Sequence, residues 1–411
     1  MKISKLFLLL VLIVSCKSET KQNASVDLYP TSNNLNDLHN PVTGNSSLPR
    51  LFSSDNKLFL SWVEKKDTVA TLNFSVFENA SWKPAEEIIS GTDWFVNWAD
   101  FPAIAATANG SILTSFLQKS ANGTYTYDVK LNLYNVVAKT WKKNFILHDD
   151  GTQSEHGFVS IRPYVGNSFV VVWLDGRDTV GKDHGGGQMT LRAAIVFEEG
   201  TIDYDTLIDE RVCDCCQTSV AIGPSDEIIV AYRDRSEDEI RDISVVKWEM
   251  ETGWSKPRTI GKDNWKIEGC PVNGPSIDAK GNTIALAWFT GNEDEGKVKV
   301  AFSTDTGTTF GAPIRIDAGN ATGRVVIEMI SETEAVVLWM EPRGNEELIR
   351  FVKVDMDGAM GTPITISKTS AERASGFPQM AVSNTSVYFS WTEGGAESSS
   401  IKTASLNLLD I

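Results

Sequence analysis

The segment IIVAY, residues 228–232, is a short apolar run that ends in an aromatic residue, and this pattern recurs along the chain. Runs of β-branched and aromatic residues bounded by Gly, Asn, Asp and Ser predict strands rather than helices. Six other runs share the form: 58–62 (LFLSW), 112–116 (ILTSF), 169–173 (FVVVW), 284–288 (IALAW), 335–339 (AVVLW) and 387–391 (VYFSW). The copies lie about 40 to 60 residues apart, a period typical of propeller blades.

Each copy reads as the second strand of a unit of four strands, because a shorter strand precedes it and a hairpin to two more follows it. We therefore predict an all-β protein with a single β-propeller of seven four-stranded blades, and six blades as the alternative. The last copy leaves three clear strands before the end of the sequence. We expect a strand from residues 26–50 to complete that blade and close the ring.

The segment STDTGTTF, residues 303–310, has the pattern Ser-x-Asp-x-Gly-x-Thr-aromatic, and weaker forms occur at 75–82, 133–141 and 249–254. This pattern resembles the Asp-box of the sialidase-like (BNR-repeat) propellers, and the resemblance covers about residues 48–408. It implies a hairpin turn between the third and fourth strands of a blade, where Asp and Gly serve the turn. The box is structural in that family and does not indicate catalysis.

The N-terminus carries Lys2 and Lys5, an apolar run over residues 6–14 and then Ser15 and Cys16. This predicts a secretory signal over residues 1–15, since the run is too short to span a membrane. Residues 13–16 (IVSC) resemble a bacterial lipobox, which implies a lipid on Cys16 and an outer-membrane lipoprotein, on either face of that membrane. Residues 16–47 then form a polar tether, and the propeller occupies residues 48–411.

The formal net charge is −16, and loss of the two signal-peptide lysines would make it −18. So acidic a surface argues against nucleic acid or anionic lipid as a partner. We expect a monomer that contacts the membrane only through its lipid.

The segment 211–243 crowds three cysteines, several arginines and several carboxylates around two predicted strands. Cys213, Cys215 and Cys216 precede the first strand, and Cys270 is the remaining cysteine of the domain. Four thiols in an oxidising compartment favour two disulfides, with Cys270 bridged to one member of the triplet. The alternative is a copper or zinc site on the four sulfurs.

The loop before each blade's first strand, here called its leading loop, and the loop between its second and third strands share one face of a propeller, where function normally lies. Charged and polar residues are dense in these loops. Those that we expect to bind an anionic ligand are Arg177, Arg233, Arg235, Glu239, Arg241, Asn273 and Arg324. The leading loops also supply Arg50, Trp98, Asp100, Glu155 and Arg373. Arginine forks recognise carboxylates, so we expect a carboxylated glycan.

Blade three resembles a sialidase most closely, through residues 161–163 (IRP), the following strand and residues 175–177 (DGR). The resemblance implies that Arg162 binds a carboxylate and that Asp183 is an acid/base. It also implies an arginine triad, with Arg233 as the second member and Arg324 or Arg343 as the third. Asp175 and His156 are further acid/base candidates on the same face.

The sequence departs from the sialidases where they carry the glutamate that activates a tyrosine nucleophile. This chain has Cys215, Cys216 and Gln217 there, and no suitable late tyrosine is evident. The covalent mechanism of sialidases requires that Tyr–Glu pair. Three functions therefore stay open: a glycan-binding or glycan-cleaving propeller, a non-enzymatic binder of ligand or metal, and a polysaccharide lyase.

Overall fold

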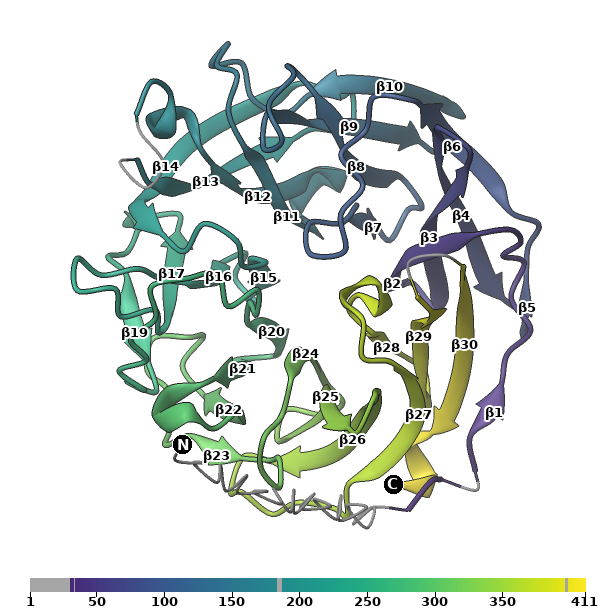
Figure 1. Ribbon diagram of the computed structural model, residues 1–411, viewed down its shortest axis with the longest axis vertical. Helices are drawn as coiled ribbons and strands as arrows, with labels where there is room; N and C mark the ends of the chain where they lie inside the picture. The colour runs from purple at the N-terminus through teal and green to yellow at the C-terminus, as the bar shows by residue number, and fades with distance from the viewer. Residues whose placement is uncertain (1–29, 33, 183–186, 396–397) are drawn as a thin grey trace, which may run out of the picture.

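The computed structural model describes residues 30–32, 34–182, 187–395 and 398–411. Seven antiparallel sheets stand around a central axis, with β2, β7, β11, β15, β20, β24 and β28 nearest to it (Figure 1). The prediction of an all-β protein with seven blades is confirmed, and the six-blade alternative is wrong.

The strands of blades 1 to 3 follow the chain. Blade 1 holds β2 (Ser46–Ser54), β3 (Lys57–Lys66), β4 (Val69–Glu78), β5 (Ser81–Trp82) and β6 (Glu86–Gly91). Blade 2 holds β7 (Ile104–Ala106), β8 (Ile112–Lys119), β9 (Tyr127–Asn135) and β10 (Thr140–Ile146). Blade 3 holds β11 (His156–Pro163), β12 (Phe169–Asp175), β13 (Met189–Val196) and β14 (Ile202–Val212).

Blades 4 to 7 continue around the ring. Blade 4 holds β15 (Ser219–Ile222), β16 (Ile228–Arg233), β17 (Ile243–Glu249), β18 (Gly253–Trp254) and β19 (Arg258–Ile260). Blade 5 holds β20 (Ser276–Lys280), β21 (Thr283–Thr290), β22 (Lys297–Ser303) and β23 (Ile314–Arg315). Blade 6 holds β24 (Gly323–Met329), β25 (Glu334–Arg343), β26 (Glu346–Asp355) and β27 (Ile364–Ser370). Blade 7 holds β28 (Gln379–Ser383), β29 (Ser386–Gly394), β30 (Ser399–Asn407) and β1 (Asn36–Asp37).

Short 3-10 turns are the only helices in the described residues. They are η1 (Val165–Asn167), η2 (Arg177–Thr179), η3 (Asn292–Asp294), η4 (Arg373–Ser375) and η5 (Leu408–Asp410). Accordingly, no described helix has the length and hydropathy needed to cross a bilayer.

An N-terminal strand closes the ring, as the sequence predicted. Asn36 and Asp37 pair antiparallel with Ser405 and Ala404 of β30, so both ends of the domain share blade 7. This pairing covers part of the outer edge of β30. Part of the segment that we had assigned to the tether, 16–47, therefore belongs to the propeller.

The aromatic residue that ends each repeat is a packing residue between blades. Trp62, Phe116, Trp173, Tyr232, Trp288, Trp339 and Trp391 are all buried. Two of the tryptophans donate to an acidic side chain two residues later: Trp173 to Asp175, at 3.0 Å, and Trp339 to Glu341, at 2.9 Å. A buried indole N–H needs such a partner, so the acid at this position is part of the scaffold.

The Asp-box segment forms the turn between β22 and β23, as expected. The Ser303 hydroxyl donates to Oδ1 of Asp305 at 2.7 Å, and the Thr309 amide donates to the same oxygen at 2.7 Å. These bonds stay within the turn, which agrees with a structural role.

Three of the innermost strands carry the same irregularity near the end where the chain enters the blade. The register of β2, β11 and β24 shifts there, and Leu48, Phe158 and Arg324 have positive φ at the shift. A β-bulge of this kind re-aims side chains at the rim of a sheet. The repeated bulge therefore shapes the end of the axis where the leading loops meet.

Candidate functional site

The leading loops and the loops between second and third strands meet at one end of the ring, here called the top face. In blade 3, His156 at the start of β11 pairs with Asp175 at the end of β12, so both open onto this face. The segment 97–101 lies at its centre, because residues from blades 1, 2, 3, 4, 6 and 7 contact it. We take this segment as the reference for the site.

Arg162 lies at the opposite end of blade 3, which corrects the prediction that it joins the top-face arginines. It pairs with Val170, next to the hairpin between β11 and β12, and its guanidinium stands over the ring of Phe52 at 5.5 Å. Burial raises the pKa of both Asp278 and Glu328, and the nearby charge of Arg162 opposes that rise. Arg162 thus belongs to a charged cluster at the lower end of the axis.

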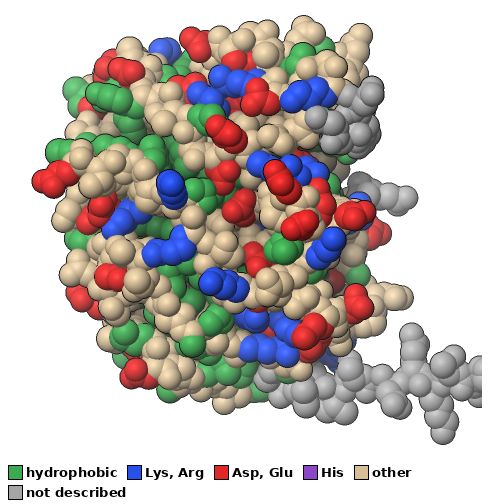
Figure 2. Space-filling model, turned by 90° about the vertical axis from the view of Figure 1, so that its left-hand side faces the viewer, with side chains coloured by type: hydrophobic (Ala, Val, Ile, Leu, Met, Phe, Trp, Pro, Cys, Tyr) green, Lys and Arg blue, Asp and Glu red, His purple; other side chains and the backbone are tan. Residues whose placement is uncertain are grey.

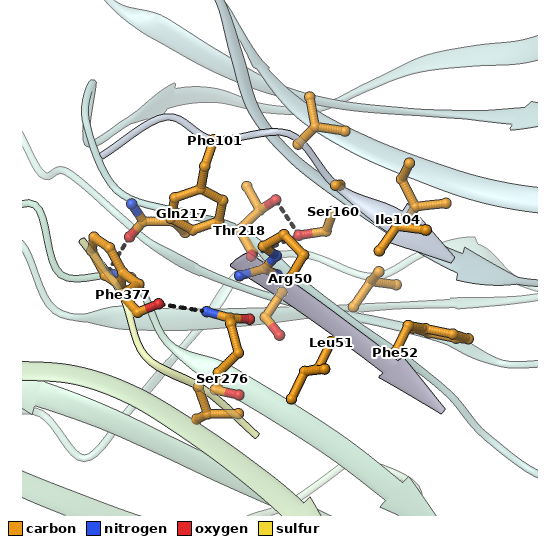
Figure 3. A pocket seen from close by; sticks show the side chains of 18 of the residues that line it. Arg50, Leu51, Phe52, Phe101, Ile104, Ser160, Gln217, Thr218, Ser276 and Phe377 are labelled. Atoms are coloured by element: carbon orange, nitrogen blue, oxygen red, sulfur yellow. Dashed lines mark hydrogen bonds between the residues drawn. The ribbon is translucent and has the colours of Figure 1, made fainter. Parts of the chain in front are cut away.

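A cavity of about 110 Å³ runs along the axis between the innermost strands. Arg50 from β2 projects into its middle, with Gln217, Phe101 and Phe377 to one side and the hydrogen-bonded Thr218–Ser160 pair nearby (Figure 3). The Arg50 guanidinium stands 4.5 Å from the centroid of the Phe101 ring. Burial, together with the charge of Arg162, lowers the pKa of Arg50 to about 10.

Two carboxyl groups share one tyrosine hydroxyl beside the segment 97–101. Oη of Tyr127 lies 2.7 Å from Oε1 of Glu155 and 3.1 Å from Oδ2 of Asp100. One hydroxyl donates a single proton, so one of the two carboxyls must be protonated for both bonds to form. Burial accordingly raises the pKa of Asp100 to about 7 and that of Glu155 to about 8. Glu155 is only half-buried and is the more accessible of the two.

This Tyr127–Glu155 contact is a tyrosine–glutamate pair that sequence reasoning missed, because 28 residues separate its members. It does not meet the needs of a sialidase nucleophile. Tyr127 is only 1% exposed, and burial first, then the adjacent carboxylates, raises its pKa well above 10. An inaccessible phenol that resists ionisation cannot attack a sugar.

Asp175 and His156, which the sequence offered as acid/base candidates, are fully buried members of a network. Arg177 donates to both oxygens of Asp175, at 2.8 and 2.7 Å, and lies 3.3 Å from Asp150. His156 lies 3.2 Å from Asp150 through Nε2. Asp175 also accepts from Trp173 and so repeats the scaffold role of Glu341 in blade 6. These contacts give Asp175, His156 and Arg177 structural partners in place of a ligand.

His148 stacks on His156 with ring centroids 3.7 Å apart. Burial, followed by the charge of His156, lowers the pKa of His148 to about 4, so this ring is neutral at pH 7. Asp128, His148 and His156 form one group whose ligand atoms lie within 4.8 Å of one another, and Asp150, His156 and Asp175 form a second. The sequence did not predict either group. Both rings contact Asp150, through Nδ1 of His148 at 2.9 Å and through Nε2 of His156 at 3.2 Å.

Arg233 is buried and fully used by the protein. Its three donor nitrogens reach the backbone oxygens of Asn273 at 2.9 Å, Arg241 at 2.6 Å and Phe289 at 2.7 Å. Trp265 lies against it, with its ring centroid 4.9 Å from the guanidinium carbon. Arg233 therefore fastens blade 4 to blade 5 and is not available to a ligand, contrary to the role that we predicted.

Asn273 likewise holds backbone in place. Its Oδ1 accepts from the amide of Arg324 at 2.7 Å, and its Nδ2 donates to the oxygen of Thr322 at 3.1 Å. The side chain is 7% exposed and supports the bulge in β24. The predicted ligand-binding role does not fit this placement.

Arg235 and Arg241 lie together with Glu239, as the sequence predicted, but nearby carboxylates neutralise their charge. Arg235 donates to both Glu239 oxygens and reaches Asp214 at 3.0 Å, and Arg241 donates to Glu239 at 2.8 Å. The sequence missed Asp214 in this network. The cluster lies on the top face but presents little unpaired charge.

The four described cysteines are all free, so the predicted pair of disulfides is not confirmed. The Sγ atom of Cys213 lies 3.6 Å from that of Cys216 and 4.0 Å from that of Cys215. A disulfide would need about 2.05 Å. The thiol of Cys270 interacts with that of Cys215, which lowers the pKa of Cys270 to about 7.

Arginine and aromatic side chains gather on the other side of the segment 97–101. The Trp98 ring stacks with Phe377 at 6.1 Å and carries the guanidiniums of Arg324 at 4.9 Å and Arg373 at 5.9 Å. Arg324 is buried, and its Nη1 donates to Ser375 at 3.1 Å and to the oxygen of Gly376. Loop position had suggested Trp98 and Arg373, but nothing in the sequence pairs them.

Asp183, a predicted acid/base, and Cys16, the predicted lipid attachment site, lie outside the described residues. On the side of the ring that bears β17 and β19, basic and acidic side chains are interspersed (Figure 2). Net acidity therefore does not mean a continuous acidic surface.

The fold is a seven-bladed β-propeller, and it is similar to that of solved polysaccharide lyases. No family model matches the chain, and no curated protein matches it. A solved polysaccharide lyase, an ulvan lyase bound to -[GlcA(1-4)Rha3S]-, is 11% identical, with a TM-score of 0.56 over 92% of this chain and 95% of that one. A protein of unknown function from Dyadobacter fermentans is 12% identical, with a TM-score of 0.53 over 92% and 100%. The Hadza microbial sialidase Hz136 is 13% identical, with a TM-score of 0.46 over 72% and 63%. The two similarities with TM-scores above 0.5 show a shared fold, and identities this low leave the function to the site.

Proposed function

We propose that the top face binds a carbohydrate, and specifically a carboxylated glycan, at Trp98 and Arg373. The observation that carries the proposal is the pair itself: a half-buried indole beside an exposed guanidinium. Sugar rings pack their C–H faces on aromatic rings, and guanidinium forks recognise carboxylates. The two groups together match a uronic or other acidic sugar.

Arg373 is the arginine of the top face best placed to accept an anion. Within the described residues its guanidinium has no hydrogen-bond or ion-pair partner, and its side chain is exposed on η4. The guanidinium groups of Arg177, Arg235 and Arg241 already donate hydrogen bonds to carboxylates of the protein. Arg324, held beneath, adds positive charge to the same indole without reaching solvent. Among the described residues of this face, the positive charge of Arg373 is therefore the one best placed for an anionic ligand.

Glu155 gives the face a group able to move a proton. A carboxyl with a pKa of about 8 is mostly protonated at pH 7, so it could donate to a departing sugar oxygen. Hydrolysis and β-elimination both need such a donor. The ulvan lyase with the same fold was solved with a saccharide that contains a uronic acid, which supports an acidic glycan but does not decide the reaction.

The test is affinity electrophoresis against acidic polysaccharides and their carboxyl-reduced forms, with R373A and W98A beside the wild-type protein. We expect retardation only by the acidic forms, reduced at least about tenfold in affinity by either change, since a charge-assisted contact contributes about 1.5 to 3 kcal/mol. R162A is the matched control, because Arg162 lies at the far end of the axis. Equal retardation of R373A and wild type would reject the site.

Any reaction is read on the same substrates. A lyase yields an unsaturated, ultraviolet-absorbing product, whereas a hydrolase yields new reducing ends without that absorbance. E155Q should abolish either activity while binding persists. Retained turnover in E155Q would remove Glu155 from the chemistry, and no turnover by wild type on a bound glycan would leave a binding protein.

We also propose that the chain is a lipoprotein of the cell envelope, acylated on Cys16 after removal of residues 1–15. The support is the lipobox-like sequence 13–16. Metabolic labelling with a fatty acid should mark the wild-type protein and not C16S. Labelling of C16S would reject this attachment site.

A further inference from the structure

The cysteine cluster has the spacing of ligands around one metal ion. The sulfurs of Cys213, Cys215 and Cys216 lie within 4.8 Å of one another, with two separations of 3.6 and 4.0 Å. Zinc–sulfur bonds of about 2.3 Å in a tetrahedron place the sulfurs about 3.8 Å apart. The observed separations bracket that edge and are far too long for disulfides.

A guanidinium group lies directly against the sulfur cluster. Cys213 and Cys216 are buried, and Nη1 of Arg241 lies 3.3 Å from the Cys213 sulfur. This positive charge favours the negative thiolates that a bound cation requires. The protein has thus placed compensating charge around the sulfurs.

Cys270, which is not one of the three mutually close sulfurs, is the candidate for a fourth ligand from a different blade. It lies in the leading loop of blade 5, and its thiol interacts with that of Cys215 in the leading loop of blade 4. Cys270 is exposed, whereas Cys213 and Cys216 are not. The cluster is therefore closed on the protein side and can admit an ion from the top face.

We propose that Cys213, Cys215, Cys216 and Cys270 bind one thiophilic d10 cation, Zn²⁺ or Cu⁺. Thiolate sulfur is the ligand that both ions prefer, and no histidine or carboxylate is needed to complete the set. The site goes beyond the proposed glycan binding and does not depend on it. Binding clamps the leading loops of blades 4 and 5 together.

The clamp acts on the centre of the top face through Gln217, the residue after Cys216. The Gln217 amide nitrogen donates to the oxygen of Ala99, and its Oε1 accepts from the amide of Gly274 at 3.3 Å. A metal on the neighbouring cysteine therefore fixes a side chain that joins blades 2, 4 and 5. Loss of the metal should loosen the segment 97–101 on which Trp98 lies.

The experiment is elemental analysis of the full chain, expressed in its native compartment and purified without chelators, with thiol titration on the same sample. We expect about one equivalent of zinc or copper per chain, and the element found identifies the ion. C213S and C216S should each lose it, while C16S, which removes the cysteine outside the cluster, should keep it. A metal-free protein with two disulfides, or with four free thiols that bind no added metal, overturns the proposal.

A second measurement covers variants that fail to fold. Wild-type protein stripped of metal and given Co²⁺ should develop thiolate-to-cobalt charge-transfer bands and tetrahedral d–d bands, and added Zn²⁺ or Cu⁺ should bleach them. C270S should keep three sulfurs and show a weaker charge-transfer band. Octahedral cobalt spectra without sulfur bands would overturn the proposal even if some metal co-purified.

Discussion

Replacing Arg233 with alanine should destabilise the propeller and leave glycan recognition to the folded fraction unchanged. The side chain is 2% exposed and fastens the end of β16 to blade 5. Its removal strands the backbone oxygens of Asn273, Arg241 and Phe289 in the interior. Buried carbonyls without hydrogen-bond partners lower the free energy of unfolding.

The magnitude follows from these contacts. Each hydrogen bond from a charged donor contributes about 1.5 to 3 kcal/mol, and the stacking on Trp265 adds about 1 kcal/mol or more. The terms are not additive, and water entering the gap recovers some of the loss. We therefore expect the free energy of unfolding to fall by at least about 3 kcal/mol.

The assay is urea unfolding followed by tryptophan fluorescence, with R373A as the matched control. Arg373 is an exposed arginine of the same face, so its removal should change stability by less than about 0.5 kcal/mol while it weakens glycan binding. The two variants should thus show opposite phenotypes. An Arg233→Ala protein that unfolds like wild type but has lost the glycan would refute the reasoning and restore the arginine to the binding site.

Three further results are expected. The free energy of unfolding should fall as pH rises from about 5 to 8. Asp100 and Glu155, with pKa values raised to about 7 and 8, hold protons in the folded state that the unfolded chain has released. E155Q should flatten this slope in pH-dependent melts, and an unchanged slope would contradict the raised pKa of Glu155. D175A should cost about 2 kcal/mol or more in urea unfolding, since it leaves half-buried Arg177 without its bidentate partner and the buried Trp173 indole without its acceptor, and wild-type stability would contradict the scaffold role. R162A should bind glycan as wild type does in the same titration, and weakened binding would place the ligand deep in the axis.

The fold could be predicted because each blade repeats the same short sequence pattern, an apolar strand that ends in an aromatic residue. Each aromatic residue that ends a second strand packs between blades, so the same physical demand recurs seven times and leaves the same pattern, as at Trp288 and Trp339. Ring closure by β1 also followed from counting strands. The start of the propeller was less visible, because β1 is only two residues long and carries no apolar alternation.

The sequence could predict which face of the propeller carries the site, but not which residues of that face are available to a ligand. Loop topology placed Arg177, Arg235 and Arg241 at the top, but carboxylates cancel their charge. These are Asp175 and Glu239 in the same loops and Asp214 from another loop. The exposed, unpaired Arg373 looks the same in sequence as the buried Arg233. What separates them is burial by Trp265 and three carbonyls, contacts that span up to 56 residues.

The resemblance to a sialidase motif placed Arg162 at the wrong end of blade 3, because residues 161–163 lie at the end of β11 that is far from the top face. The cysteines show the reverse case. Their number suggested bridges, whereas the separations of their sulfurs are set by a loop geometry that the spacing Cys-x-Cys-Cys does not reveal.

A crystal structure of the complex with an acidic oligosaccharide tests the central claim most directly. We predict a sugar ring stacked on Trp98, with its carboxylate held by Arg373 and its glycosidic oxygen near Glu155. A saccharide bound away from these residues, or one that meets Trp98 but turns its carboxylate away from Arg373, would contradict the account.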